Sequence, residues 1–288
     1  MRKTALSFSI LLAVAIAVAG FAGPLVPAKD KPKAEELVTK HLDALGTVEA
    51  RSALKSLNVE GNLLTRFLRG GSGTAGGPFG MVSTGHKILM EAKFDLPTYP
   101  GESYAFDGEK KTIGYVVPGQ RSQLEDFLNY NGEVLAEGLI GGTLSTAWPL
   151  YDWQTRNARL DVDGLKKVDG KELLRITYHP RHGTGDLKIY LFFDPETFRH
   201  VKTIYTEQSQ AQMGSTPGMS SVGGGANLTL EEDFGGFTTV NKLMLPTQWS
   251  IKYTQEGVGG GSSIVQFDMT IARVQANPNV SGVAFRIQ

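Results

Sequence analysis

The chain has 288 residues, and its 29 lysine and arginine residues balance 29 aspartate and glutamate residues, so it carries no net charge. This balance excludes the basic surface on which nucleic-acid-binding proteins depend. Cysteine is absent, which excludes disulfide bonds, thiol catalysis and the lipid-attachment cysteine of a bacterial lipoprotein.

The first residues have the pattern of a secretory signal peptide. Arg2 and Lys3 precede an apolar run over residues 5–19, and small residues follow. This pattern predicts a signal peptide over residues 1–22, with cleavage between residues 20 and 28. The run is too short for a membrane-spanning helix, so we expect an exported protein, periplasmic or secreted, that is not an integral membrane protein. Residues 30–288 contain no linker and are expected to form a single domain.

Helical spacing at the start of this domain predicts two helices. The first is expected over residues 33–45 and the second, shorter one over residues 48–54. The first has an apolar stripe that would pack on an apolar surface, formed by Leu37, Val38, Leu42 and Leu45.

Alternating apolar and polar residues then predict strands. Those expected in the first half cover residues 57–67, 82–94, 102–106 and 111–117. Residues 121–140 interrupt the alternation with one or two helical turns.

The strand pattern resumes at residue 159 and continues towards the end of the chain. A hairpin is expected over residues 159–179, because Asp169 and Gly170 favour a tight turn. The clearest strand covers residues 187–193, where alternate residues form one apolar face: Leu187, Ile189, Leu191 and Phe193. Further strands are expected at 198–206, 228–234, 237–242, 249–253 and 265–271.

Together these segments predict a mainly β fold with a few helices and about 10–11 strands. A single antiparallel sheet of that width twists and curls. Its apolar face needs a cover, which only the predicted helical pieces can supply.

Three glycine-rich runs, at residues 70–80, 214–225 and 257–263, are interpreted as flexible hairpin connections. The first matches the glycine spacing of a dinucleotide-binding loop. However, Pro78 and a strand follow it instead of a helix, so we expect no nucleotide cofactor there.

Several segments resemble the outer membrane lipoprotein sorting protein family, the LolA-like group of periplasmic carriers. They are HLDALGTVEARSALKSLNVEG at 41–61, LAEGLIGGTLSTAWPL at 135–150, LFFDPETFRHVK at 191–202 and LPTQW at 245–249. The resemblance implies an incomplete, half β-barrel covered by a helical lid, with a hydrophobic cavity for acyl chains. The implied partners are lipid or acylated lipoprotein cargo and an acceptor on the outer-membrane side.

Lipid binding in such a cavity needs large apolar side chains on the covered face of the sheet. The candidates are Leu63, Phe67, Ile88, Met90, Phe94, Trp148, Trp153, Trp249, Phe267 and Met269. For each of them, packing in an ordinary core is the competing interpretation.

Other functions are weighed against the carrier. The same fold could serve as a lipid-sensing or partner-binding regulatory module. A secreted metal-dependent hydrolase could use His179 and His182, which lie in one predicted hairpin loop. No nucleophile motif of the GxSxG kind occurs, and adjacent strand residues such as Glu231 and Glu232 point to opposite faces. We therefore expect no enzyme, no catalytic residue, no metal site and no cofactor.

Overall fold

The computed structural model describes residues 33–209, 226–257 and 261–287, which belong to one compact unit, Lys31–Gln288. The predicted signal peptide, residues 1–22, lies outside the described residues. So do the glycine-rich run at 214–225 and residues 258–260 of the last such run. No helix in the described part of the chain is long and apolar enough to span a membrane.

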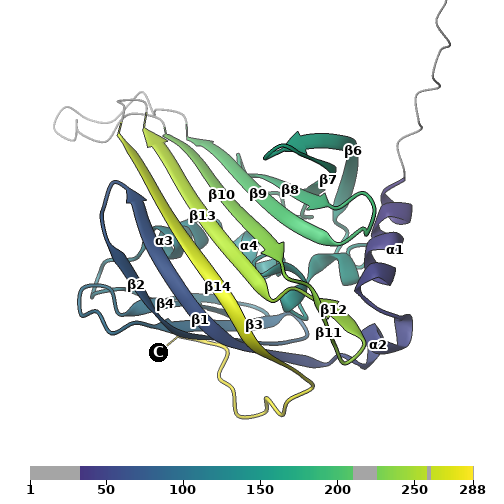
Figure 1. Ribbon diagram of the computed structural model, residues 1–288, viewed down its shortest axis with the longest axis horizontal. Coiled ribbons are helices and arrows are strands. Elements are labelled where there is room, and N and C mark those ends of the chain that lie inside the picture. The colour runs from purple at the N-terminus through teal and green to yellow at the C-terminus, as the bar shows by residue number, and fades with distance from the viewer. Residues whose placement is uncertain (1–32, 210–225, 258–260, 288) are drawn as a thin grey trace, which may run out of the picture. The chain divides into compact units, whose positions relative to one another are not determined.

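A large antiparallel sheet dominates the fold (Figure 1). Twelve strands pair in the order β5-β4-β3-β2-β1-β14-β13-β10-β9-β8-β7-β6. Their bounds are β1 Ser56–Arg69, β2 Thr74–Thr84, β3 Lys87–Lys93, β4 Gly101–Phe106, β5 Lys111–Ile113, β6 Arg159–Val168, β7 Lys171–His179, β8 Lys188–Phe193, β9 His200–Ser209, β10 Ala226–Gly235, β13 Gln248–Gly257 and β14 Ser262–Ala276. A separate two-stranded sheet consists of β11 (Thr238–Val240) and β12 (Leu243–Leu245).

The predicted fold class is confirmed: the described chain is mainly β, with one wide antiparallel sheet that does not close into a barrel. β1 pairs with β14, which places the first and the last strand of the described chain side by side in the middle of the sheet. The meander predicted around residues 187–193 is also present, as β7, β8 and β9.

The prediction of a flexible connection over residues 70–80 is wrong, because residues from Thr74 onward form β2. The glycines of this strand allow other backbone to approach closely. A Cβ at Gly77 would lie 2.0 Å from the carbonyl oxygen of Lys93. These residues therefore mark tight strand packing rather than a loop.

The single strand predicted over residues 82–94 is also wrong, because a turn divides it. β2 ends at Thr84 and β3 begins at Lys87. Gly85 between them has a φ of 55°, a conformation that glycine adopts without strain. The turn shifts which residues of β2 face inward, so that Met81 and Ser83 are buried.

Bulges help the wide sheet to curl. β1 shifts its register against β14 between Glu60 and Gly61. A Cβ at Gly61 would lie 2.1 Å from the carbonyl oxygen of Thr270, so the bend requires glycine. β6 shifts its register against β7 just before Gly164.

Both predicted N-terminal helices are confirmed, as α1 (Ala34–Leu45) and α2 (Val48–Ala53). The helical turns predicted at 121–140 are α3 (Gln123–Tyr130) and α4 (Glu133–Ala136), and α3 begins with a capping box between Ser122 and Glu125. Two single 3-10 turns follow, η1 (Gly142–Leu144) and η2 (Pro149–Tyr151). We call residues 122–157 the lid segment.

Candidate functional site

The candidate site is the sheet face that the lid segment covers, which we call the inner face. α3 and α4 lie behind the strands in the view of Figure 1; α3 contacts β4 and β5, and α4 contacts β4. The lid segment contributes buried apolar side chains to the interface: Leu124, Phe127, Leu128, Val134, Leu135, Leu139, Ile140, Leu144, Trp148 and Leu150. They belong to the same hydrophobic core as the inward-facing residues of the strands. Side chains of the lid segment therefore pack directly against the sheet, and the face is closed.

The predicted lipid-binding residues are all in or against this core. Seven of them come from strands: Leu63 and Phe67 on β1, Ile88 and Met90 on β3, Trp249 on β13, and Phe267 and Met269 on β14. Phe94 directly follows β3, whereas Trp148 and Trp153 belong to the lid segment. Whether any of them contacts lipid stays a prediction.

Strand register brings some of these residues together. Met269 pairs with Leu63 on one side and with Trp249 on the other, so three of them form a row across β1, β14 and β13. Phe67 and Phe94 are not paired with this row, and both rings pack on the Tyr99 ring, with centroid distances of 5.5 and 5.2 Å. Trp153 is only half-buried.

A buried carboxyl group, Glu232 on β10, lies at the centre of the inner face. It accepts hydrogen bonds from the Trp249 indole N–H at 2.9 Å, the Tyr205 hydroxyl at 2.8 Å and the Gly141 backbone N–H at 2.8 Å. The last bond comes from the lid segment, so Glu232 ties the lid to two strands. Burial raises the pKa of Glu232 to about 7.

A second buried polar contact joins α1 to the lid segment. The Trp148 indole N–H donates to Nε2 of His41 at 3.0 Å, and Nδ1 of His41 lies 3.1 Å from the carbonyl oxygen of Phe198. These partners fix His41 as the neutral tautomer with its proton on Nδ1. Burial lowers the pKa of His41 to about 4. The ring of His200 packs on Trp148 with a centroid distance of 4.5 Å.

A third buried polar group lies where α3 begins. Glu102 accepts hydrogen bonds from the Tyr99 hydroxyl and, at 2.7 Å, from the hydroxyl of Ser122. Burial raises the pKa of Glu102, and the neighbouring Glu125 raises it further. Glu102 therefore joins β4 to the first turn of the lid segment through buried hydrogen bonds.

Sequence reasoning missed these polar residues under the lid segment. One signal was available, because Glu231 and Glu232 were expected on opposite faces of a strand. That expectation is confirmed: Glu232 is fully buried under the lid segment, whereas Glu231 pairs with Lys202 on the other face. A carboxylate in an inward-facing strand position is rare unless it is hydrogen-bonded.

The two histidines of the hydrolase hypothesis have separate surroundings. His179 lies 3.0 Å from a carboxylate oxygen of Asp161 on the paired strand β6. His182 lines a cleft beside Tyr130 and Glu133. Among the described residues, no group of three or more histidine, aspartate or glutamate side chains is placed to hold a metal ion.

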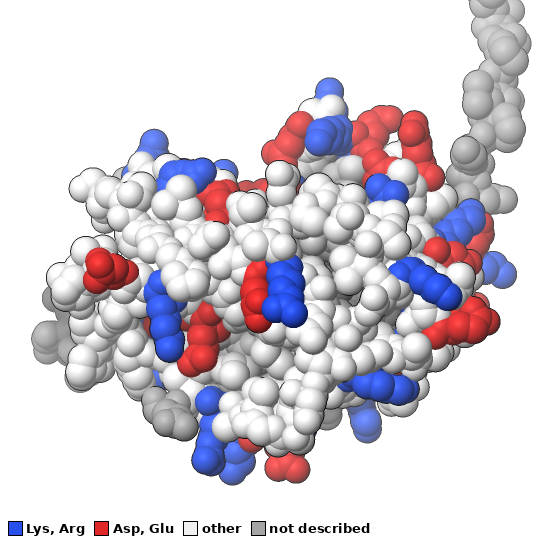
Figure 2. Space-filling model, turned by 60° about the horizontal axis from the view of Figure 1, so that its bottom comes forward, with Lys and Arg blue, Asp and Glu red and all other residues white. Residues whose placement is uncertain are grey.

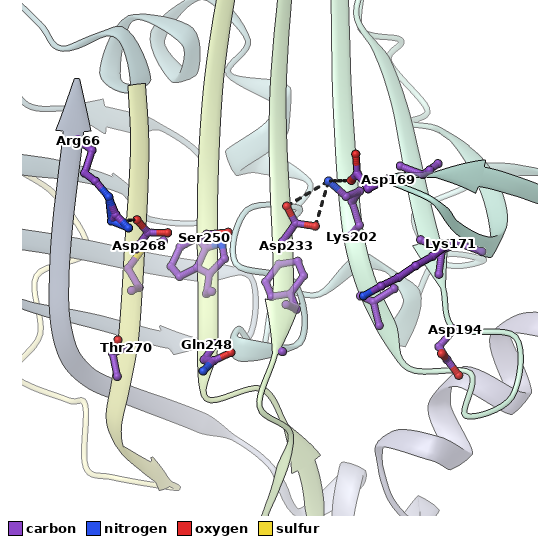
Figure 3. A pocket seen from close by; sticks show the side chains of 17 residues that line it. Arg66, Asp169, Lys171, Asp194, Lys202, Asp233, Gln248, Ser250, Asp268 and Thr270 are labelled. Carbon is purple, nitrogen blue, oxygen red and sulfur yellow. Dashed lines mark hydrogen bonds and ion pairs between the residues drawn. The ribbon is translucent and has the colours of Figure 1, made fainter. Parts of the chain in front are cut away.

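The opposite face of the sheet has a polar cleft of about 520 Å³. Figure 3 shows two groups of paired charges in it: Arg66 contacts Asp268 at 2.6 Å, and Lys202 contacts both Asp169 and Asp233, whereas Lys171 and Asp194 are drawn without an ion pair. In the view of Figure 2, charged side chains likewise stand singly or next to an opposite charge, without a patch of one sign. Lys202 thus joins the β6–β7 turn, through Asp169, to β9 and β10, and the Arg66–Asp268 pair joins β1 to β14.

No family model and no curated protein matches the chain. Solved structures do show similarity. A LolA superfamily protein from Nitrosomonas europaea has a TM-score of 0.44 and 12% identity, over 86% of this chain and 95% of that one. A domain from Vibrio parahaemolyticus, described as a putative outer membrane lipoprotein-sorting protein domain, has a TM-score of 0.43 and 9% identity, over 88% of this chain and 95% of that one. A DUF1329 family protein from Desulfovibrio piger has a TM-score of 0.39 and 10% identity, over 86% and 94%.

Proposed function

We propose that this protein is an exported, periplasmic carrier that binds lipid, or the acyl chains of lipoproteins, on the inner face of its sheet for transport toward the outer membrane. The main support for this proposal is the way in which the inner face is covered. A wide apolar sheet surface is covered by one segment of short helices and turns, rather than by a second sheet. Such a cover can move away without breaking any strand pairing.

The chemistry of the covered face suits acyl chains. Each CH₂ group moved from water to an apolar surface contributes about 0.8 kcal/mol. An acyl chain that takes the place of lid side chains against Leu63, Trp249 and Met269 would bury its own carbons and keep the sheet covered. Contacts between the ligand and the sheet would thus replace the apolar contacts that the lid segment loses when it opens.

Hydrogen bonds fasten the lid segment to the rest of the fold at several points along its length. Besides the bonds to Glu232 and His41, the Thr146 backbone N–H donates to the Ser83 hydroxyl at 3.0 Å. Just after α3, the Asn131 side chain donates to Glu207 at 3.3 Å. Between these points the chain turns at glycines with positive φ, among them Gly138 and Gly141. Glycine gives these turns the backbone freedom that opening requires.

Native mass spectrometry of the protein purified from a bacterial envelope tests the proposal. We expect a population that carries co-purified lipid or acylated peptide and loses it on organic extraction. The extracted protein should then bind a fluorescent fatty acid that unlabelled fatty acid displaces. Absence of both co-purified lipid and fatty acid binding would contradict the carrier function.

Tryptophan fluorescence can locate the bound chain. The chain has three tryptophans, and Trp249 lies on the inner face of the sheet whereas Trp153 follows η2. A brominated fatty acid quenches only an indole that it contacts. Trp153→Phe should therefore retain most of the quenching, and Trp249→Phe should lose a large part of it. The reverse pattern would place the ligand elsewhere.

A further inference from the structure

A cleft of about 540 Å³ lies where three segments of the chain meet. They are the β4–β5 hairpin, the junction of α3 and α4 in the lid segment, and the loop between β7 and β8. β5 and β4 form one end of the twelve-stranded sheet, whereas β8, β7 and β6 form the other. Both ends of the curled sheet therefore reach the same stretch of the lid segment at this cleft.

The lining of the cleft changes from exposed residues to residues of the core. Tyr130, at the end of α3, is 81% exposed. Phe106 of β4 and Leu187 before β8 also line the cleft, but both are buried and belong to the hydrophobic core. An amphipathic ligand could therefore keep its polar end among the exposed residues and direct its apolar end toward the core.

The exposed part of the cleft carries charges of both signs that do not pair. Lys111, Glu109 and Glu133 all line it. Among the described residues, none of the three takes part in an ion pair. The polar cleft on the opposite face differs, because there Lys202 contacts three carboxylates. The charges beside the lid segment are thus available to a ligand.

Backbone groups of the lid segment position the ammonium group of Lys111. It donates to the backbone carbonyl of Asn129, near the end of α3. A Cβ at Gly132 would lie 2.6 Å from Nζ of Lys111, so glycine leaves room for the ammonium group there. The next residue along the chain is Glu133. An ammonium group has three N–H donors, and Asn129 uses one of them, so two can bind an anionic group.

We propose that this cleft binds the headgroup of a phospholipid in which a phosphate is joined to an ammonium group, with the phosphate on Lys111 and the ammonium group on Glu133, while the acyl chains pass Phe106 and Leu187 toward the inner face. The inference rests on the proposed carrier function and adds the chemical class of the lipid. Lysine is a common phosphate ligand, and the exposed ring of Tyr130 suits an ammonium group.

Other headgroups fit these charges less well. A purely anionic headgroup would bring its charge close to Glu109 and Glu133, which repel it. An uncharged headgroup would leave the charges of both signs without a partner. We therefore expect the cleft to discriminate between lipids that have the same acyl chain.

Competition binding tests this discrimination. Lysophosphatidylethanolamine, lysophosphatidylglycerol and monoacylglycerol with one common acyl chain, each below its micelle concentration, would displace a fluorescent fatty acid from the delipidated full chain. Each partly exposed charge contact should contribute about threefold in affinity, so lysophosphatidylethanolamine should bind on the order of tenfold more tightly than monoacylglycerol. The ratio of two affinities measured in one protein does not depend on how tightly the probe binds.

Two substitutions separate the two charge contacts. Lys111→Met should lower the affinity for both phosphate-containing lipids relative to monoacylglycerol. Glu133→Gln should remove the advantage of lysophosphatidylethanolamine over lysophosphatidylglycerol. The matched controls are Lys110→Met and Asp126→Asn, which remove one charge of each sign from exposed residues that do not line the cleft. Both controls should keep the wild-type order of affinities, and thermal unfolding would verify that all four variants are folded.

The outcomes distinguish this inference from the carrier function. Lysophosphatidylethanolamine that binds no more tightly than the other two lipids, or a preference for it that survives both Lys111→Met and Glu133→Gln, would overturn the headgroup site while the carrier function stands. Failure of all three lipids to displace the probe would instead contradict the carrier function and this inference with it.

Discussion

The buried carboxyl group of Glu232 should make folding stability depend on pH in a direction opposite to ordinary acid denaturation. Its pKa is raised from 4.5 to about 7 in the folded protein. The folded state therefore holds this proton more tightly than the unfolded state. The contribution of this protonated carboxyl group to the free energy of unfolding is fully present below pH 4.5 and is lost as the pH rises through about 7.

The size of the effect follows from that shift. One pKa unit corresponds to about 1.4 kcal/mol, so the raised pKa of Glu232 amounts to roughly 3 kcal/mol in the free energy of unfolding. His41 acts in the opposite direction, because its pKa is lowered from 6.5 to about 4 and its contribution is lost as the pH falls through that range. The two effects overlap, so the wild-type profile alone does not separate them.

Comparison with Glu232→Gln isolates the carboxyl group, because His41 contributes equally to both proteins. Glutamine keeps an acceptor and stays neutral at every pH. Urea denaturation at pH values from 4.5 to 8 should show the wild-type protein losing roughly 3 kcal/mol relative to Glu232→Gln over this range. A difference between the two proteins that does not change with pH would refute the assignment of Glu232 as a buried acid with a raised pKa.

Three further substitutions test the packing around the site by urea denaturation. Tyr104→Phe removes a buried hydroxyl without a partner among the described residues and should raise the free energy of unfolding by about 1 kcal/mol; a loss of stability would mean that the hydroxyl is paired. Gly138→Ala should destabilise the protein by about 2 kcal/mol or more, because Gly138 has a φ of 67° and a Cβ there would lie 2.2 Å from the Ala147 carbonyl oxygen. An unchanged stability would contradict that geometry. Lys202→Met should cost about 1 kcal/mol, because the buried ammonium group of Lys202 contacts three carboxylates, of which those of Asp169 and Asp233 are at least half-exposed and stay hydrated without it; an unchanged stability would mean that these ion pairs contribute nothing to folding.

Local sequence pattern was sufficient for the strands whose two faces differ. In residues 187–193, the four residues of the predicted apolar face are all buried, and so is Phe192 on the other face. The same reasoning failed at β2, where glycine replaces the side chains from which alternation is read. Gly77 is there because a neighbouring backbone leaves no room for a side chain, and that contact with Lys93 is not visible in local sequence.

The apolar part of the candidate site was partly predictable, since large inward-facing residues such as Trp249 stand out in the strand pattern. The polar part was not. Glu232 meets Gly141 across 91 positions of sequence, and nothing in either neighbourhood indicates the other. Only the pairing of β10 between β9 and β13 brings Tyr205 and Trp249 to the same carboxyl group.

A covalent link between the lid segment and the sheet would show whether the ligand enters beneath the lid segment. Asn131 and Glu207 join the end of α3 to β9, and the chain has no cysteine of its own. Asn131→Cys combined with Glu207→Cys can therefore be joined by a short bismaleimide. A control pair, Lys188→Cys with Thr206→Cys, joins neighbouring strands and leaves the lid segment free. We expect the locked protein to bind no fluorescent fatty acid while the cross-linked control binds it normally; equal binding by both would contradict entry of the ligand beneath the lid segment.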